Sequence, residues 1–340
     1  MGLRMLPQKP GLFIFLFMGA LLCSLPLKSA GVVYKGTKGP GVGKHIVLVA
    51  GDDEYHSEEE FPQLAKILAT RHGFTCTVLF SINPADGTID PHATRNIPGL
   101  EALQNADLLI IFTRFRDLPD DQMKYLVDYI ESGRPIIGIR TATHAFDLKT
   151  SKTYARYSWN SQIYGWEGGF GRRVFGTTWV AHHAHHGHQS TRGIIAKGEE
   201  HNPILRGIKN GAIWVPTDVY AIQMLPGTAQ PLILGEVLTG MHPNDPPVQG
   251  NLNDPMIPVA WTNRFTGTQG KTARVFATTM GAADDFENEA LRRLLVNATY
   301  WTLGLKVPRK ADVRLVGEYH PHSFLSREYT HGVKPSDLAN

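Results

Sequence analysis

The chain has 340 residues, of which 42% are hydrophobic and 19% are charged, and its formal net charge is +3. This length and apolar content suffice for one large α/β domain or two small ones, and they exclude a disordered chain. No run of Lys or Arg is dense enough to form a nucleic-acid-binding face, so the charge pattern predicts no nucleic-acid partner.

The first 30 residues have the layout of a signal peptide. Arg4 and Lys9 precede an apolar stretch over residues 12–22, and small residues follow it. This stretch is short for a transmembrane helix, so we predict an exported protein, periplasmic or secreted, with no membrane span in the mature chain. An uncleaved N-terminal anchor is the alternative. Removal of the signal would leave Cys76 without a partner for a disulfide within the chain.

Strands and helices are predicted to alternate from residue 44 onward, after a Gly- and Lys-rich linker over residues 31–43. The expected strands of the first half cover residues 45–50, 75–80, 107–112 and 135–139, and the expected helices lie at residues 57–72, 100–103 and 119–132. Ser57 with Glu60 three residues later is typical of a helix start. This alternation predicts an α/β fold with a doubly wound, mostly parallel sheet and helices on both faces.

The strand over residues 135–139 organises the predicted site, because its apolar run stops abruptly at a charged residue. The turn after it presents Arg140, Thr141 and His144. Its spacing is similar to the sharp turn on which many α/β hydrolytic enzymes hold a nucleophile, but it contains neither cysteine nor serine. The sequence therefore predicts chemistry at this turn without a nucleophile of that kind.

Polar side chains also follow two other predicted strands. Asp52, Glu54 and His56 come after the first strand, and Arg114 comes after the third. Because the carboxyl ends of parallel strands lie along one edge of a sheet, we expect these side chains to converge with the turn at Arg140. For any single residue, a role in a turn or a helix cap is the alternative.

An aromatic and glycine-rich segment over residues 153–179, which includes Trp166, is predicted to form a wall over the crevice. Stacking on the face of a sugar ring is one use of such a wall, and an aromatic core under a long loop is the alternative. Further along, Asp218 lies among aromatic residues and is a candidate carboxylate of the crevice. The Pro-rich loop over residues 240–258 is a candidate cover for it.

Five histidines lie within residues 182–188. Such a cluster can bind a divalent metal, although a defined site needs ligands held on one side of a rigid element. If residues 180–184 form a strand, His182 and His183 point to opposite faces, so at most one of them enters the crevice. Ordered metal binding, a catalytic or substrate-binding His182, and a structural role all stay open.

The second half is predicted to add an edge strand at residues 191–197, strands at residues 232–238, 258–262 and 273–279, a short helix near residues 201–207 and an amphipathic helix over residues 287–303. Beyond this helix, residues 306–340 are polar and show no periodicity. This pattern indicates a C-terminal tail that either packs on the domain or is disordered.

With these motifs in place, the chain resembles the ThuA-like family, which is named for trehalose utilisation and whose fold is similar to that of class I glutamine amidotransferases. The resemblance covers residues 44–305. It rests on Tyr55-His56 after the first strand, residues 138–146 at the turn, residues 182–186 before Thr191-Arg192, residues 201–204, and the closing helix over residues 292–301.

Compared with an amidotransferase, Arg140 stands at the position of the nucleophilic cysteine. A guanidinium that stays protonated cannot attack a carbonyl carbon. The late histidine of that family would fall near residues 280–284, where ThuA-like proteins often carry a Gly-His pair and this chain has Gly281-Ala282. Glutaminase activity is therefore not expected.

The resemblance implies a role in carbohydrate metabolism, with trehalose or a 3-keto disaccharide as the small-molecule partner. A keto sugar carries acidic protons beside its carbonyl, so isomerisation or elimination needs a base and a cation. The expected catalytic residues are His56, His144 and His182 for proton transfer and Arg140 or Arg114 for the oxyanion. The expected substrate-binding residues are Asp52, Glu54, Arg114, Thr141, Trp166 and Asp218.

Two other classes of function stay open. The chain could be a non-catalytic carbohydrate-binding module that lost its nucleophile, or an interaction scaffold without a sugar ligand. A divalent metal at residues 182–188 would take the part of the arginine, and a homo-oligomer is compatible with the sequence.

Overall fold

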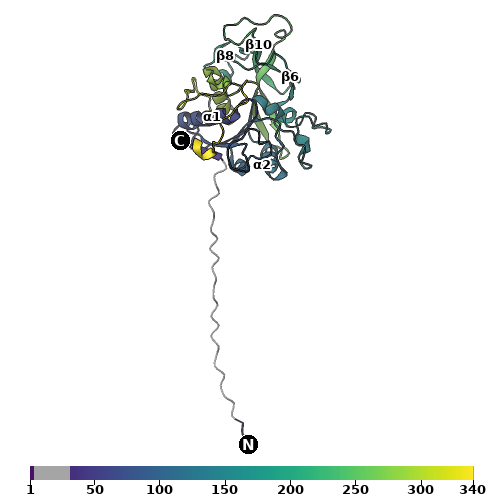
Figure 1. The fold of residues 1–340 in the computed structure, drawn as a ribbon, viewed down its shortest axis with the longest axis vertical. Helices are drawn as coiled ribbons and strands as arrows, with labels where there is room; N and C mark the ends of the chain where they lie inside the picture. The colour runs from purple at the N-terminus through teal and green to yellow at the C-terminus, as the bar shows by residue number, and fades with distance from the viewer. Residues whose placement is uncertain (4–30, 340) are drawn as a thin grey trace.

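The computed structural model describes residues 1–3 and 31–339, so the predicted signal peptide lies almost wholly outside the described residues. A large sheet crosses the molecule (Figure 1). Its ten strands lie in the order β1-β3-β2-β4-β5-β12-β11-β10-β7-β8. Its strands are β1 (Gly31–Lys35), β2 (His45–Gly51), β3 (Thr75–Phe80), β4 (Leu108–Thr113), β5 (Ile136–Ile139), β7 (Thr191–Ile195), β8 (Ile213–Val215), β10 (Gln230–Val237), β11 (Ile257–Thr266) and β12 (Thr272–Thr278). A separate pair is formed by β6 (Trp179–His182) and β9 (Tyr220–Ile222).

The helices lie between these strands. The α-helices are α1 (Ser57–His72), α2 (Asp120–Glu131) and α3 (Glu289–Thr302). The short helical turns are η1 (Leu100–Asn105), η2 (Arg140–His144), η3 (Ala155–Tyr157), η4 (Gly171–Phe175), η5 (Pro203–Leu205), η6 (Asp285–Glu287) and η7 (Pro335–Leu338). Within the described part of the chain, none of the helices has the length and apolar character needed to cross a membrane.

The predicted α/β class is confirmed, and the large central sheet is mixed. Strands β3, β2, β4, β5 and β12 pair in parallel, whereas β12, β11, β10, β7 and β8 pair antiparallel. The loop between β11 and β12 has only five residues, which is too short for a parallel crossover. The predicted edge strand β7 lies one place inside the sheet, because β8 pairs with its outer side.

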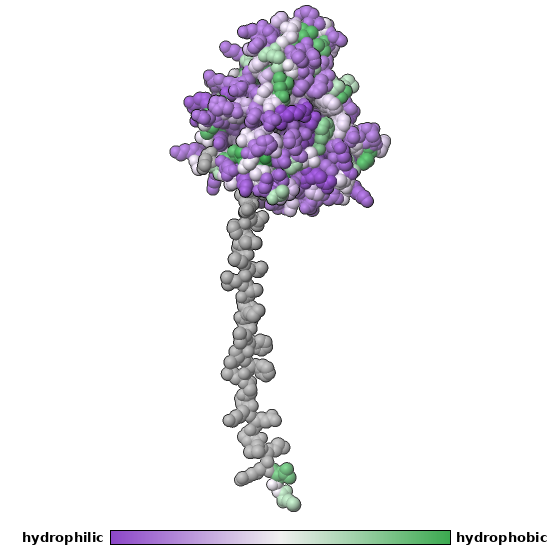
Figure 2. Space-filling view, viewed as in Figure 1, coloured by the Kyte–Doolittle hydropathy of each residue, from purple (hydrophilic) through white to green (hydrophobic). Residues whose placement is uncertain are grey.

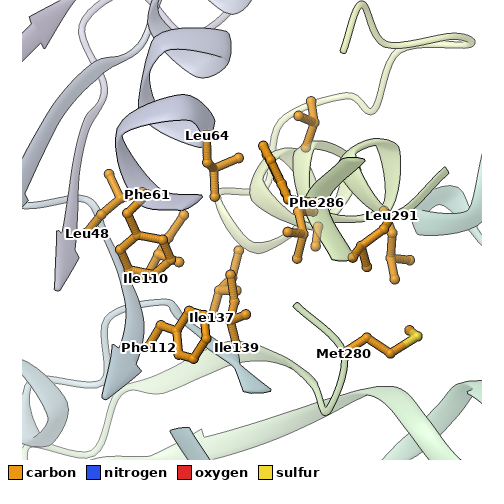
Figure 3. Packing of buried hydrophobic residues seen from close by; sticks show 14 of the residues in the cluster. Leu48, Phe61, Leu64, Ile110, Phe112, Ile137, Ile139, Met280, Phe286 and Leu291 are labelled. Carbon is orange, nitrogen blue, oxygen red and sulfur yellow. The ribbon is translucent and has the colours of Figure 1, made fainter. Parts of the chain in front are cut away.

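The apolar core lies on both faces of the parallel half, because side chains alternate along each strand. In β2, Ile46 and Leu48 belong to a cluster with residues of α1 and α3, whereas Val47 and Val49 belong to a cluster with residues of α2. Figure 3 shows part of the first cluster, where Leu48 lies beside Phe61 of α1. The helices thus cover both faces and leave the carboxyl ends of the strands uncovered by α-helix.

The linker predicted over residues 31–43 is wrong for its first five residues. Gly31–Lys35 form β1, which pairs antiparallel with β3. Val32 and Tyr34 are buried while Val33 is exposed, and the Tyr34 hydroxyl donates to the Leu338 carbonyl at 2.7 Å. A three-residue apolar pattern between glycines and lysines is too short to be recognised without its partner strand.

The start of α1 also differs from the expectation. Ser57 is the first helical residue and not the cap, since His56 at the cap position has a left-handed φ of 57°. The Ser57 hydroxyl instead accepts a hydrogen bond from the Asp52 backbone N–H at 3.1 Å. The predicted helix end at Gly73 is confirmed, with φ 85°.

The C-terminal segment, residues 306–339, packs on the domain and does not extend away from it. Gln63 of α1 exchanges two hydrogen bonds with the backbone of Val316, at 3.3 and 2.9 Å. Phe324 stacks on Tyr55 with ring centroids 6.3 Å apart. The C-terminus lies beside α1 (Figure 1), and the face in Figure 2 is mainly hydrophilic with scattered apolar residues. The first of the two alternatives for the tail is therefore observed.

The contact between this segment and Asp284 predicts a pH-dependent stability. Asp284 accepts a hydrogen bond from the Phe324 N–H at 3.1 Å, and its other carboxylate oxygen is buried without a partner. Burial, and then repulsion by Asp285, raises the pKa of Asp284 to about 7. The folded state therefore holds a proton that the unfolded chain releases near pH 4. The contribution of protonated Asp284 to the stability of the folded state is complete below about pH 4, and it is lost as the pH rises through about 7.

We expect the unfolding temperature to fall between about pH 4 and about pH 7, and Asp284→Asn to flatten this slope. Each unit of pKa difference corresponds to about 1.4 kcal/mol at most. Thermal unfolding followed by circular dichroism across this range measures the effect. The exposed Asp86→Asn is the matched control and should keep the wild-type slope. An unchanged slope in Asp284→Asn would contradict the assignment.

Candidate active site at the carboxyl edge of the sheet

Three non-glycine residues with positive φ mark one edge of the sheet. They are His56, Phe115 and Arg140, with φ values of 57°, 49° and 46°. Each follows a parallel strand, and these strands, β2, β4 and β5, are neighbours. Such left-handed conformations cost about 1–3 kcal/mol each and gather at functional sites. Backbone strain therefore concentrates where the topology predicted a crevice.

A small pocket with polar and aromatic lining lies at this edge, with a cavity volume of about 40 Å³. Its lining includes Glu54, Arg114, Thr141, His144, His182 and Tyr220. Five of these six were expected from the sequence, because they follow β2, β4 and β5 or lie in the histidine cluster. Tyr220 was not expected, since no sequence signal separated it from other aromatic residues.

His144 is the buried imidazole of the pocket. Its ring lies between Phe115 and Trp179, with centroids 5.0 and 5.6 Å away. Burial, reinforced by the positive charges of Arg114 and Arg140, holds the pKa of His144 well below its usual value. The imidazole is therefore neutral near pH 7.

A chain of hydrogen bonds defines which nitrogen of His144 carries the proton. The Tyr220 hydroxyl donates to the Arg140 carbonyl at 2.6 Å, because a carbonyl can only accept. The Thr143 hydroxyl must then donate to Tyr220, at 2.9 Å, and so accepts from His144 Nδ1 at 3.1 Å. Nδ1 thus bears the hydrogen, and Nε2 keeps its lone pair without a hydrogen-bond partner among the described residues. The pocket holds a preformed base.

A second cluster is built around Asp218, which lies in the loop between β8 and β9. Its two carboxylate oxygens accept from His182 Nδ1 at 2.8 Å and from His186 Nδ1 at 2.9 Å. Arg140 also donates to one of these oxygens, at 3.1 Å. Burial alone would raise the pKa of Asp218, but the hydrogen bonds from both histidines and the charge of Arg140 outweigh it and lower the pKa. Asp218 is therefore a carboxylate that orients two imidazoles.

The pKa of His182 is raised, chiefly by its hydrogen bond to Asp218. The ring of His182 is partly exposed at the pocket, and its Nε2 is turned from the carboxylate by the bond at Nδ1. His186 belongs to the same pair but was not singled out in the sequence. Only the histidine run itself could have indicated it.

Arg140 lies in the interior and not at the oxyanion position that was expected. Its side chain is 1% exposed, with the guanidinium 4.4 Å from the Tyr55 ring centroid. It donates to the Asp218 carboxylate and backbone and to the Thr279 carbonyl. With these partners it cannot reach a ligand in the pocket. Arg140 is therefore a positioning residue that acts through Asp218.

His56 also lies outside the pocket. Its Nε2 donates to the carbonyls of Ser323 and Ser326, at 3.2 and 3.1 Å, in the C-terminal segment. Burial opposes protonation, but Glu58 and Glu59 outweigh it and raise the pKa of His56 to about 9. A protonated, fully bonded imidazole cannot act as the expected base, so His56 anchors the C-terminal segment.

Two further candidates, Asp52 and Trp166, do not line the pocket. Asp52 is fully buried beneath the pocket, where it accepts from the Thr141 hydroxyl at 2.7 Å and the Glu54 N–H at 2.8 Å. It therefore orients the loop that carries Glu54. Trp166 packs on Tyr157, with centroids 4.6 Å apart, and does not line the pocket. For Trp166, the alternative of an aromatic core under a loop fits better.

A larger groove of about 600 Å³ adjoins the pocket. Trp159 and Trp179 line it, with ring centroids 5.9 Å apart, and Trp179 also lines the pocket. Side chains of Asn160 and Gln223 supply hydrogen-bonding groups. The aromatic wall predicted over residues 153–179 thus exists, but these two tryptophans form it in place of Trp166.

Among the residues that the structure describes, two groups of side chains could hold a metal ion. One nitrogen of His182, one of His186 and an oxygen of Asp218 lie within 4.8 Å of one another. The second group is His56 with Glu58 and Glu59, and its imidazole already bonds the C-terminal segment. In the first group the two imidazoles are partly exposed, so His182 and His186 are the better candidates.

Comparison with known proteins gives the family. The family model described as "Trehalose utilisation", ThuA, matches residues 47–302. The chain belongs to the ThuA family. Membership indicates a role connected with trehalose utilisation.

Solved structures similar to this ThuA protein include ThuA-like proteins from Parabacteroides merdae ATCC 43184 and Bacteroides uniformis ATCC 8492. They share 12% and 16% sequence identity with it, at TM-scores of 0.48 and 0.46. The matches cover 80% and 79% of this chain and 96% and 95% of those chains. No curated protein matches the sequence.

Proposed function

We propose that this ThuA protein is an exported enzyme of carbohydrate metabolism that moves protons on an oxidised, carbonyl-bearing sugar. The observation that carries the proposal is the neutral His144, whose tautomer leaves Nε2 as a free base in the pocket. A base with these properties suits removal of a proton beside a carbonyl. It does not suit amide hydrolysis, for which the turn offers neither cysteine nor serine.

The reaction uses two groups of the pocket. His144 Nε2 takes a proton from the carbon beside the sugar carbonyl; the electron pair of that C–H bond forms a C=C bond, and the π pair of the carbonyl moves to its oxygen. Arg114 supplies positive charge for the resulting enolate, since it lines the pocket and is one-quarter exposed. For isomerisation, the hydroxyl on the deprotonated carbon gives its proton to the enolate oxygen, and His144 returns its proton to the former carbonyl carbon. For elimination, the carbonyl re-forms and the C=C bond shifts to the next carbon as its oxygen substituent leaves, and His144 gives its proton to the departing oxygen.

The sizes of the two cavities support a sugar substrate. A volume of about 40 Å³ admits only the reacting edge of a ring, whereas the adjoining groove of about 600 Å³ is in the range of small-molecule sites. Trp159 and Trp179 offer flat apolar faces for the C–H groups of a pyranose, and amide groups on the rim suit its hydroxyls. We infer that the body of the sugar lies in the groove.

The proposal also covers the origin of the fold. We infer a doubly wound sheet of the class I glutamine amidotransferase type, in which Arg140 took the place of the nucleophile. The left-handed φ of 46° at Arg140, directly after β5, supports this because a nucleophile turn needs the same conformation.

The experiment is proton exchange in D₂O. The full-length protein is incubated with 3-keto disaccharides, and deuterium beside the carbonyl is measured by NMR and mass spectrometry. We expect protein-dependent incorporation, with Trp159→Ala raising KM more than it lowers kcat, because Trp159 contacts only the body of the sugar. Binding without exchange would favour the non-catalytic carbohydrate-binding module. If the protein neither binds the sugar nor exchanges its protons, the interaction scaffold is the function that agrees with the result.

A further inference from the structure

We propose that this protein binds a divalent transition-metal ion through Nε2 of His182, Nε2 of His186 and Oε1 of Glu54. The inference goes beyond the proposed function, because it concerns a metal site and can be tested without any sugar. It is carried by the buried carboxylate behind both histidines and by Glu54 Oε1, which lies 4.0 Å from His186 Nε2.

Asp218 prepares both imidazoles for a metal. Each carboxylate oxygen accepts from one Nδ1, at 2.8 Å from His182 and 2.9 Å from His186. Both rings therefore carry the hydrogen on Nδ1 and turn Nε2 away from the carboxylate. Metal-binding histidines commonly have this arrangement, in which a carboxylate behind the ring fixes its orientation and increases its basicity. The two rings are close, with centroids 4.8 Å apart.

Direct binding of the metal to Asp218 is disfavoured by Arg140. The guanidinium donates to Asp218 Oδ1 at 3.1 Å, and both groups are almost fully buried. A divalent cation on the same carboxylate would lie against a permanently charged guanidinium in a poorly solvated region. The charge of Asp218 is already balanced, so the ion belongs on the far side of the rings.

Glu54 supplies the third ligand atom. Its Oε2 accepts from Arg114 at 2.7 Å, which leaves Oε1 directed at His186 Nε2 at 4.0 Å. Nitrogen and oxygen ligands lie about 2.0–2.2 Å from Zn²⁺, so two ligands of one ion are at most about 4 Å apart. One ion therefore fits between Glu54 Oε1 and His186 Nε2. If these two atoms moved about 0.6 Å closer together, their spacing would match tetrahedral coordination. Asp52 holds the loop in place by accepting from the Glu54 N–H at 2.8 Å.

The other histidines of the run have different surroundings. His183 directly follows β6, and its Nε2 bonds the Leu252 carbonyl at 2.9 Å. His185 and His188 stack on each other, with centroids 4.2 Å apart. Only two of the five histidines converge on Asp218. This difference supplies a matched control within the same segment.

Three protein ligands would leave a coordination position open toward the pocket, which Glu54 and His182 line together with His144. Imidazole and carboxylate ligands suit Zn²⁺, Fe²⁺ and similar ions better than Ca²⁺ or Mg²⁺. An oxygen of a bound molecule would fit the open position. The open position on the metal therefore favours molecules that bind through an oxygen atom.

The test uses the full-length chain without a polyhistidine tag, stripped with EDTA and returned to metal-free buffer. Zn²⁺ and Co²⁺ are titrated by calorimetry, and bound metal is counted by mass spectrometry. We expect about one ion per chain and a rise in unfolding temperature with metal concentration. His186→Ala should weaken binding by at least about 100-fold, and Asp218→Asn by about 10–100-fold.

The double variant His185→Ala/His188→Ala is the control and should bind metal like the wild type. Because Asp218→Asn could fail to fold, the more exposed His182→Ala and His186→Ala carry the test. The proposal is overturned if the wild type binds well below one ion per chain, or if the control variant loses binding as much as His186→Ala. Proton exchange by the stripped protein is measured separately, so failure of either proposal is distinguishable.

Discussion

Replacement of His144 by glutamine is expected to lower the rate of proton exchange on the keto sugar by about 10²–10⁴-fold, the usual contribution of a general base. Glutamine keeps the size and a hydrogen bond to Thr143 but offers no lone pair of suitable basicity. The rate of deuterium incorporation measures the loss, and KM should change little. His183→Gln is the matched control, because His183 bonds the Leu252 carbonyl and does not line the pocket.

Thr143→Val tests the hydrogen-bond chain behind this base. Valine has the shape of threonine but cannot accept from His144 Nδ1, so the proton is free to move to Nε2. We expect a smaller rate loss than in His144→Gln. An unchanged rate in both variants would mean that the base is a different residue, and His182 would be the next candidate.

Replacement of Arg140 by methionine is expected to lower the free energy of unfolding by about 3–5 kcal/mol, because it leaves Asp218 buried with less positive charge around it. An Arg140 at the oxyanion position, as expected from the sequence, would instead give a loss of activity without unfolding. Urea denaturation with linear extrapolation measures the change. The control Lys124→Met removes a surface pair whose partners are 59% and 58% exposed, and should leave the free energy of unfolding almost unchanged.

The double variant Arg140→Met/Asp218→Leu separates charge from packing. Removal of both charges should recover part of the lost stability, because no unpaired charge then stays buried. A loss below about 1 kcal/mol in Arg140→Met would contradict the anchoring role of Arg140. Failure of the double variant to recover would assign the loss to packing between Tyr55 and Tyr220.

The sequence was sufficient to predict the edge of the sheet at which the pocket lies. Apolar runs that stop at Asp52, Arg114 and Arg140 identify three strand ends, and parallel strands bring such ends together whatever their detailed packing. For the same reason Glu54, Thr141 and His144 could be expected near one another. The two alternating core faces of β2 follow equally from local periodicity.

The direction of each side chain at that edge could not be predicted. A left-handed φ at Arg140 turns its guanidinium inward, and nothing in the residue type indicates this conformation. His56 forms hydrogen bonds with the backbone carbonyls of Ser323 and Ser326, which lie more than 260 positions away in the chain. Local patterns contain no information about such a partner.

The sequence therefore specified the α/β class, the strand ends and the set of polar residues near them, since these depend on periodicity and on the geometry common to parallel sheets. It did not specify the pairing of Asp218 with Arg140, His182 and His186, which are separated from it by 78, 36 and 32 positions. Those contacts arise only when distant segments pack. Burial and hydrogen bonding then decide whether a polar side chain acts as a base, a buried anchor or a metal ligand. These two factors set the pKa of the side chain, the tautomer of a histidine and the direction in which the side chain points.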